Sequence, residues 1–139
     1  DTFVSNLDFA AAELEKAGIR LLIEPINSID IPGFYLTHTR QGRSIINEVG
    51  SNNLFLQYDI YHMQIMEGDL ARTIEANLDV IRHVQLADNP GRHEPGTGEI
   101  NYSYLFQVID GSEYEGWIGC EYSPKSTTSE GLNWTDNYL

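Results

Sequence analysis

Four polar residues stand near the ends of apolar segments that have the length of buried strands. They are Glu24, Asp59, Gln85 and Glu121. In a parallel α/β array the carboxyl ends of the strands share one face, where loops build the active site. Three carboxylates and an amide oxygen that converge there would repel one another unless a cation lay between them. Because oxygen ligands suit a hard cation, these four residues predict a site for Mg²⁺ or Mn²⁺. For any one carboxylate, the alternative is an ion pair with Lys or Arg in the core.

A long polar loop adds two candidates for substrate binding. The stretch "HVQLADNPGRHEPGTGEINY", residues 83–102, begins like a buried strand and contains Arg92, one of eight basic residues in the chain. Arg binds a carboxylate through two parallel hydrogen bonds, so Arg92 is predicted to reach a substrate carboxylate. His62, three residues after Asp59, could donate a hydrogen bond to a substrate oxygen or contact a ligand carboxylate. A solvated arginine and a structural histidine are the alternatives.

Helix-like and strand-like segments alternate along the chain and would position these residues. Strand-like segments begin at about residues 19, 53, 82 and 117, a repeat of about 29 to 35 residues that is typical of a βα unit. Their nearly continuous apolar composition predicts a parallel sheet built from right-handed βαβ units. Four such units make either a small open sheet or half of an eight-stranded barrel. The predicted strands are 19–26, 53–62, 82–88 and 117–122, and the predicted helices are 6–18, 37–50, 67–81 and 101–116, with a last helix starting near 128.

Alternation within the strands predicts which side chains share the interior side of the sheet. Strand residues two apart face the same way, so Gln57 should accompany Asp59 and His83 should accompany Gln85. Cys120, next to Glu121 in sequence, should face the helices instead. Trp117 and Trp134 are predicted to lie in the core.

Composition limits the classes of function. The chain of 139 residues is predicted to form a single domain, 1–139, and its abrupt start at a helix-like segment suggests a fragment of a longer protein. With 8 basic and 21 acidic residues, its formal charge of −13 argues against nucleic-acid binding, although it also suits a solvated acidic surface. No apolar run is long enough for a membrane span. A single cysteine permits no internal disulfide and favours a cytoplasmic setting.

Several motifs resemble one enzyme family. The stretches "EPIN…DIPGF", "LFLQYDIYHMQIMEGDL", "HVQLADNPGRHEPGTGEINY" and "GWIGCEY" are similar to the C-terminal half of bacterial hydroxypyruvate isomerases, which belong to the xylose-isomerase-like (β/α)8 barrels. The resemblance implies an α/β fold of the (β/α)8 TIM-barrel type, with this chain covering about the last four βα units. A whole family member would carry four more units before Asp1.

The resemblance also implies an activity. It is the interconversion of hydroxypyruvate and 2-hydroxy-3-oxopropanoate (tartronate semialdehyde), an aldose–ketose type of proton shift in glyoxylate and carbohydrate metabolism. By motif, Glu24 and Glu121 match the two acid/base glutamates of the family. Glu24, Asp59, Gln85 and Glu121 match residues that hold a divalent metal in related barrels, although many relatives have a histidine where Gln85 stands.

His62 and Arg92 match substrate-contacting positions in related sugar epimerases. The expected partner is a small hydroxy or keto acid, with no nucleic acid and no membrane. Because half a barrel exposes two sheet edges, a homo-oligomer is a further expectation. Two alternatives remain open: an isomerase of a related 2-oxo- or 3-oxo-tetronate, and an inactive truncated binding fragment. A metal-dependent endonuclease on the same barrel is disfavoured by the charge and by the scarcity of histidine.

Overall fold

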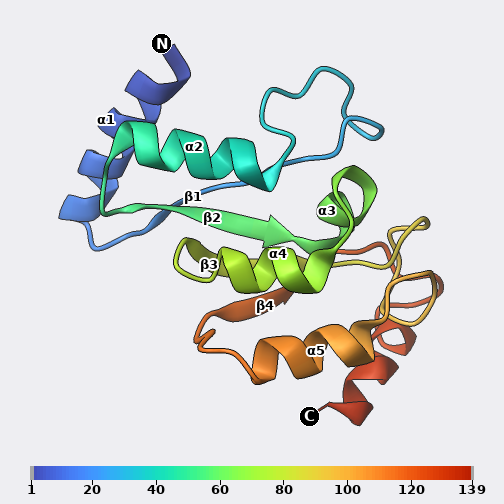
Figure 1. The fold of residues 1–139 in the computed structure, drawn as a ribbon. Coiled ribbons are helices and arrows are strands. Elements are labelled where there is room, and N and C mark those ends of the chain that lie inside the picture. The colour runs from blue at the N-terminus through green and yellow to red at the C-terminus, as the bar shows by residue number, and fades with distance from the viewer. Residues whose placement is uncertain (1, 139) are drawn as a thin grey trace.

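The sheet has four parallel strands that follow one another in the order of the chain. In the computed structural model, which describes residues 2–138, the strand order is β1-β2-β3-β4 (Figure 1). Residues 1 and 139, the ends of the predicted domain, lie outside the described residues. The strands are β1 (Leu21–Ile23), β2 (Leu54–Asp59), β3 (Ile81–Leu86) and β4 (Trp117–Cys120).

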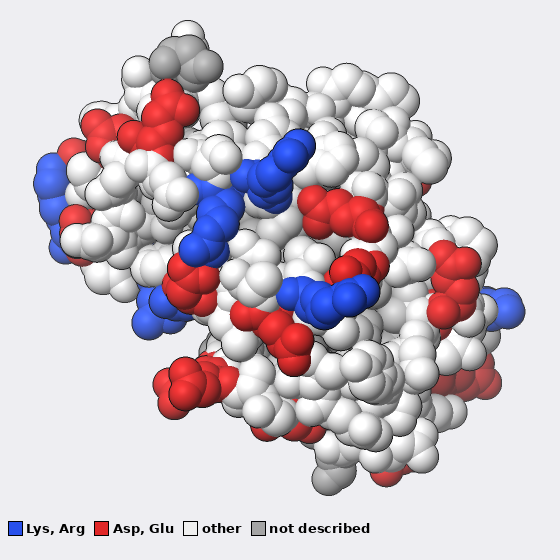
Figure 2. All heavy atoms as spheres, in the orientation of Figure 1, with Lys and Arg blue, Asp and Glu red and all other residues white. Residues whose placement is uncertain are grey.

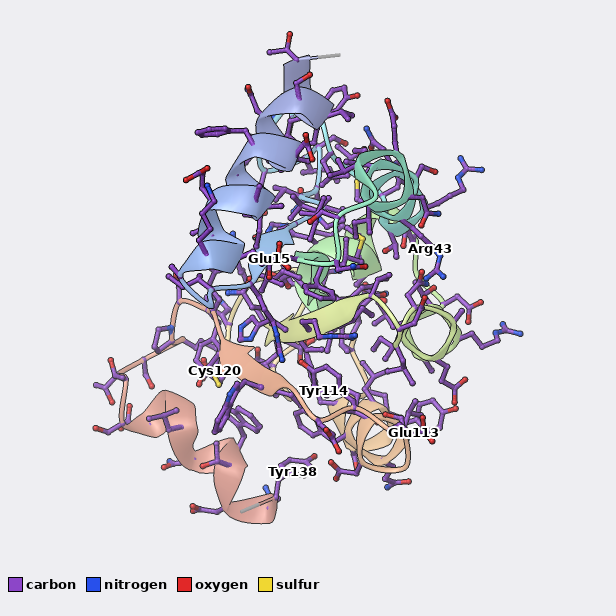
Figure 3. All side chains as sticks on the ribbon, turned by 90° about the vertical axis from the view of Figure 1, so that its left-hand side faces the viewer. Glu15, Arg43, Glu113, Tyr114, Cys120 and Tyr138 are labelled. Carbon is purple, nitrogen blue, oxygen red and sulfur yellow. The ribbon has the colours of Figure 1, made fainter. Side chains whose placement is uncertain are left out.

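Helices connect the strands and cover one face of the sheet. The helices are α1 (Thr2–Lys16), α2 (Thr39–Val49), α3 (Ile60–Met66), α4 (Leu70–Ala76) and α5 (Tyr102–Asp110), followed by a 3-10 helix, η1 (Glu130–Asn137). Figures 1 and 3 show α2, α4 and α5 on the same face of the sheet. Gly50 ends α2 in the left-handed conformation at φ 68°, and its N–H donates to the carbonyl of Ile46. This is the parallel α/β arrangement that the sequence predicts.

The core lies between the sheet and this helical layer. Leu54, Leu56 and Tyr58 on β2 are buried, as are Val84 and Leu86 on β3. The intervening residues belong to the opposite face, because successive strand residues alternate between the two sides.

The register of the strands confirms the predicted alternation. Gln57 pairs with His83 and Asp59 pairs with Gln85 across β2 and β3. The parallel sheet therefore presents one apolar side to the helices and one polar side that carries the predicted site residues.

The predicted strand 53–62 was wrong at its C-terminal end. β2 stops at Asp59 and α3 begins at once with Ile60. The physical reason is a cap: an oxygen of the Asp59 side chain accepts a hydrogen bond of 2.8 Å from the backbone N–H of Tyr61. His62 therefore lies in the first turn of a buried helix. The predicted helix 67–81 was too long, since α4 spans only Leu70–Ala76.

The two tryptophans have different environments. Trp134 of η1 packs against the core, with its ring stacked on Phe106 at a centroid distance of 5.8 Å. The prediction of a core position was wrong for Trp117, whose side chain is 82% exposed. Trp117 is in register with His83, on the side of the sheet opposite α5, where the described residues supply no covering layer. Cys120 has an exposed free thiol.

Charge is distributed over the helix-bearing face. Figure 2 shows acidic side chains scattered there, several of them beside Lys or Arg. Arg43 and Asp79 form one such pair, with two hydrogen bonds of 2.7 and 2.8 Å that join α2 to the turn before β3. In the part of the chain that the structure describes, no helix combines the length and apolar character needed to cross a bilayer.

Candidate active site

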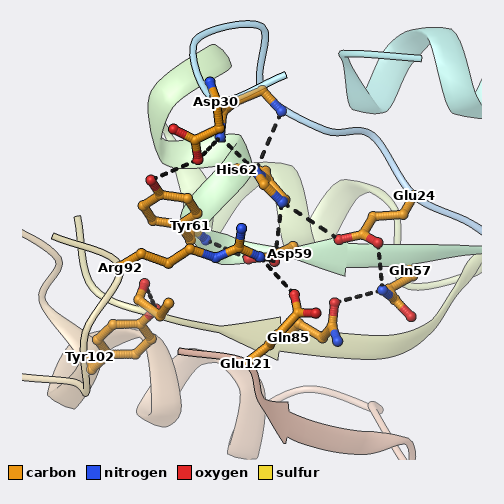
Figure 4. A network of polar contacts seen from close by, with 12 residues as sticks. Glu24, Asp30, Gln57, Asp59, Tyr61, His62, Gln85, Arg92, Tyr102 and Glu121 are labelled. Atoms are coloured by element: carbon orange, nitrogen blue, oxygen red, sulfur yellow. Dashed lines mark hydrogen bonds and ion pairs between the residues drawn. The ribbon is translucent and has the colours of Figure 1, made fainter. Parts of the chain in front are cut away.

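The predicted site residues gather at the carboxyl ends of the four strands. Glu24 follows β1, Asp59 ends β2, Gln85 lies in β3 and Glu121 follows β4 (Figure 4). His62 comes from the first turn of α3 and reaches the same place. The strand order puts Glu24 and Glu121 just beyond the ends of the outer two strands, with Asp59 and Gln85 on the strands between them.

Glu24, Asp59 and His62 form the centre of the site. His62 Nε2 lies 3.9 Å from Glu24 Oε1 and 3.7 Å from Asp59 Oδ2. One ligand-capable atom from each of the three residues lies within 4.8 Å of the other two. Within residues 2–138, neither Glu24 Oε1 nor Asp59 Oδ2 has a hydrogen-bond partner, although both atoms are buried. Two desolvated carboxylate oxygens thus face the same small space.

Burial changes the ionisation of these three groups. Burial, together with the charges of Asp59 and Glu121, raises the pKa of Glu24 to about 7. Burial raises the pKa of Asp59 to about 6, against the opposing effects of the Tyr61 backbone N–H and of Arg92. The same desolvation, reinforced by Arg92, lowers the pKa of His62 to about 4, so the imidazole is neutral at pH 7. The centre therefore holds an excess of negative charge that His62 does not balance.

Gln57 links the two halves of the site. Its Nε2 donates to Glu24 Oε2 at 2.8 Å and to Gln85 Oε1 at 2.6 Å. One oxygen of Glu24 is thereby fixed by a hydrogen bond while the other stays free. The amide oxygen of Gln85, which the sequence nominates as a metal ligand, is engaged by Gln57.

Arg92 approaches from the loop after β3 and binds Glu121. Its Nη2 lies 2.8 Å from Glu121 Oε2 and 4.0 Å from Asp59 Oδ2. The guanidinium also lies over the ring of Tyr61, 5.1 Å from the ring centroid, and the hydroxyl of Tyr61 donates to Asp30 at 2.9 Å. Arg92 has φ 52°, an uncommon backbone conformation for a residue other than glycine. The structure thus brings Arg92 to Glu121 and Asp59, and its role in substrate binding stays a prediction.

The carboxylate of Asp88 organises the loop that carries Arg92. Asp88 is fully buried and accepts hydrogen bonds from the backbone N–H groups of Asn89, Gly96 and Ile100 at 2.8 to 3.1 Å. Gly98 packs so closely that an added Cβ would lie 2.1 Å from the carbonyl oxygen of Asn89. The length and the glycines of this loop therefore serve a defined path rather than a simple turn.

Sequence reasoning missed four residues of the site or left them without a role. Strand alternation places Gln57 on the correct side but gives it no function, and the predicted site does not include Asn27, Asp30 or Tyr61. A usable signal existed for Asn27 and Asp30, because polar residues directly after a parallel strand lie at the edge where sites form. The contacts of Gln57 and Tyr61 depend on hydrogen-bond partners from other elements, which the sequence does not fix.

The donor set fits a hard divalent cation. Glu24 Oε1 and Asp59 Oδ2 are buried carboxylate oxygens without a hydrogen bond from any described residue, and Mg²⁺ and Mn²⁺ bind such oxygens. The predicted ligands Gln85 and Glu121 lie at the same strand ends but bind Gln57 and Arg92. The roles of Glu24, Asp59, Gln85 and Glu121 as ligands stay a prediction.

Comparison with known proteins identifies the family of this chain. A model of the xylose isomerase-like TIM barrels matches residues 1–138. The chain belongs to this family. Both the expected resemblance and the predicted fold, a TIM barrel of which this chain is a part, are confirmed.

Two similar proteins are named as isomerases. The chain is 61% identical over 137 residues to hydroxypyruvate isomerase of Escherichia coli and 49% identical over 138 residues to 2-oxo-tetronate isomerase of Cupriavidus necator. Each match covers 99% of this chain and 53% of the relative. The chain therefore spans about half the length of these curated relatives.

Two solved structures contain a region with the fold of this chain. A crystal structure described as AP endonuclease, family 2, from Brucella melitensis has a TM-score of 0.95 at 44% identity, covering 99% of this chain and 53% of that one. The 3-keto-D-glucoside 4-epimerase of E. coli has a TM-score of 0.82 at 25% identity, with 96% and 52% covered.

The raised pKa of Glu24 predicts how stability depends on pH when no metal is bound. Below its ordinary pKa of 4.5, Glu24 is protonated in both the folded and the unfolded states, and above about pH 7 it is ionised in both. Between these values the unfolded chain releases the proton first, so rising pH removes stability. Glu24→Gln removes this loss of stability. The free energy of unfolding of Glu24→Gln minus that of the natural protein should therefore increase by up to about 3 kcal/mol from pH 5 to pH 8.

Urea denaturation in EDTA at these two pH values measures the difference. Glu15→Gln removes one negative charge from an exposed position of α1 and serves as the matched control. An equal stability difference between Glu24→Gln and the natural protein at both pH values would show that Glu24 is not perturbed by its surroundings.

Proposed function

We propose that the protein carrying this chain is an isomerase that interconverts hydroxypyruvate and 2-hydroxy-3-oxopropanoate. The observation that carries the proposal is the free, buried oxygen of Glu24 beside Asp59 and His62, in a chain 61% identical to hydroxypyruvate isomerase of E. coli. The activity is proposed for the whole protein, because the chain matches about half of that relative.

The reaction moves a proton between two adjacent carbons. In hydroxypyruvate, C2 is the carbonyl and C3 carries a hydroxyl and two hydrogens. Removal of one C3 proton gives an enediolate; a proton is then returned to C2 while the C3 hydroxyl loses its proton and the C2 oxygen gains one. No external oxidant or reductant is needed. The site must supply a base, an acid, and groups that hold the two oxygens.

Glu24 and Glu121 are suited to the acid and base roles. In the metal-free site burial raises the pKa of Glu24 to about 7, so its protonated and ionised forms are both populated near neutral pH, which suits proton transfer in either direction. Gln57 fixes one Glu24 oxygen and leaves the other free to reach the substrate. Glu24 and Glu121 come from the outer strands β1 and β4, so a substrate held over β2 and β3 has one carboxyl group on each side.

Charged and polar neighbours would hold the substrate. Arg92 brings a guanidinium to Glu121, and a substrate carboxylate would compete with Glu121 for its donors. His62, neutral at pH 7, would hydrogen-bond a substrate oxygen. Asp59 and Glu24, with Gln85 and Glu121 as the further predicted ligands, would hold Mg²⁺ or Mn²⁺. When bound, such a metal would act as a Lewis acid that stabilises negative charge on the substrate oxygens.

A second candidate is the isomerisation of a four-carbon 2-oxo-tetronate. The relative from Cupriavidus necator, 49% identical, carries that name. The same proton shift between two adjacent carbons would serve both substrates, so the two candidate functions differ only in the length of the substrate that the site accepts. Phosphodiester cleavage of nucleic acid is disfavoured, because 21 acidic residues against 8 basic ones oppose binding of a polyanion.

Removal of either acid/base glutamate should abolish most of the turnover. We expect Glu24→Gln and Glu121→Gln each to lower kcat by about 10²- to 10⁴-fold on hydroxypyruvate, the range typical for a lost general acid or base. The assay uses the full-length protein with Mg²⁺ or Mn²⁺, and a parallel assay with 2-oxo-tetronate identifies the better substrate. Glu115→Gln, in the exposed turn before β4, is the matched control. Near-natural turnover in either site variant would rule out the two-glutamate mechanism.

Loss of Arg92 should weaken binding far more than folding. For Arg92→Ala we expect kcat/KM to fall about 10- to 150-fold, mainly through KM, because a hydrogen bond to a charged partner is lost. The free energy of unfolding should change by no more than about 1 kcal/mol, since the pair with Glu121 is partly exposed. Arg72→Ala, which removes an exposed ion pair with Asp69, is the control. An unchanged KM would remove Arg92 from the substrate site.

A further inference from the structure

Asn27 is a fully buried polar residue that the mechanism above does not use. It follows Glu24 by three residues, in the loop after β1, and its exposed fraction is 0%. Its side-chain amide lies 2.7 Å from His62 Nδ1, measured from Asn27 Nδ2, and its backbone N–H also points at that atom, at 3.4 Å. Both donors of Asn27 thus meet at one nitrogen of the imidazole.

The surrounding backbone fixes the orientation of the Asn27 amide. Asn27 Oδ1 accepts hydrogen bonds from the backbone N–H groups of Ile29 at 3.1 Å and of Asp30 at 2.7 Å. The NH₂ group on the other side donates to Asp30 Oδ2 at 3.0 Å. An amide turned the other way would leave two backbone donors facing an NH₂ group. It would also place the amide oxygen against the carboxylate of Asp30, so this orientation is excluded.

The fixed amide determines which nitrogen of His62 carries the proton. A nitrogen 2.7 Å from an NH₂ group must accept, so Nδ1 is unprotonated. An imidazolium carries a proton on both nitrogens, so a ring that accepts at Nδ1 is neutral and has its one proton on Nε2. Nε2 is the atom that faces the free carboxylate oxygens of Glu24 and Asp59, at 3.9 and 3.7 Å.

We propose that Asn27 is a positioning residue that holds His62 in the form protonated on Nε2, which keeps His62 a hydrogen-bond donor and prevents it from ligating a cation. A protonated Nε2 has no lone pair to offer a metal. The triad of Glu24, Asp59 and His62, although compact enough to hold an ion, therefore supplies only its two carboxylates. The donor role toward a substrate oxygen rests on the proposed function, whereas the position of the proton does not.

The form of His62 can be measured directly by ¹⁵N NMR. Histidine labelled with ¹⁵N in the ring is incorporated into the full-length protein, and His62 is assigned by comparison with His62→Gln. At pH 7 we expect Nδ1 to resonate as an unprotonated ring nitrogen and Nε2 as a protonated one. Addition of saturating Mg²⁺ should leave both assignments unchanged. A proton on Nδ1, or loss of the Nε2 proton on addition of Mg²⁺, would overturn the proposal without any variant of Asn27.

Two variants test whether Asn27 is the cause. Asn27→Asp keeps an oxygen for the turn but replaces the donor to Nδ1 with an acceptor, so we expect a proton on Nδ1 of His62. Asp30→Asn removes the carboxylate that also accepts from the Asn27 NH₂ group and leaves the contact with His62. We therefore expect the proton of His62 to remain on Nε2, as in the natural protein. A proton that stays on Nε2 of His62 in Asn27→Asp, or that lies on Nδ1 in Asp30→Asn, would overturn the role of Asn27.

The spectra separate this inference from the proposed function. If the protein fails to isomerise hydroxypyruvate and 2-oxo-tetronate while His62 carries its proton on Nε2, the proposed function fails and the role of Asn27 stands. If the protein is an active isomerase and His62 carries its proton on Nδ1, the function stands and the role of Asn27 is wrong.

Discussion

The structure is organised around a local excess of buried negative charge. Glu24 and Asp59 lie at the ends of neighbouring strands, and within residues 2–138 each has one buried carboxylate oxygen without a hydrogen bond. Their raised pKa values express the cost of ionising them in that position. These two oxygens do not stabilise the fold, because an unpaired buried polar group destabilises the folded state. Such a pair is suited to a cation and to proton transfer.

The rest of the site moderates this charge without removing it. Gln57 donates a hydrogen bond to the second oxygen of Glu24, and the backbone N–H of Tyr61 donates one to the second oxygen of Asp59. Arg92 binds Glu121 at 2.8 Å but stays 4.0 Å from Asp59, so the positive charge of the loop is directed mainly at the outer strand. His62 is held neutral. Among the described residues, the contacts of Gln57 and of the Tyr61 N–H each fix one carboxylate oxygen and leave the other without a hydrogen bond.

Sequence reasoning predicted the elements and the location of the site, and it failed where side-chain contacts decide. The polar residue at each strand end and the two-residue alternation were sufficient to place Glu24, Asp59 and Gln57 on one side of a parallel sheet. The start of α3 was missed because the strand pattern continues through an apolar stretch, and the cap formed by Asp59 is visible only in three dimensions. Trp117 is exposed because it lies on the side of the sheet opposite α5, and the strand pattern does not reveal which side the helices cover.

The roles of Asn27 and of the loop around Asp88 could not be read from residue types for the same reason. An asparagine after a strand predicts a turn, and Asn27 does form one. Its second contact, with His62, joins positions 35 residues apart and depends on the direction in which α3 leaves β2. Local patterns thus locate the polar edge of the sheet, whereas tertiary packing assigns its hydrogen bonds.

Binding of Mn²⁺ to the full-length protein, followed by electron paramagnetic resonance at pH 7, tests most directly whether the charge of Glu24 and Asp59 serves a cation. We expect one Mn²⁺ per chain in the natural protein and in Glu15→Gln, and an affinity at least about 10-fold lower in Asp59→Asn. Absence of Mn²⁺ binding in the natural protein, or equal affinity in Asp59→Asn, would contradict the proposal that these buried carboxylates form a metal site.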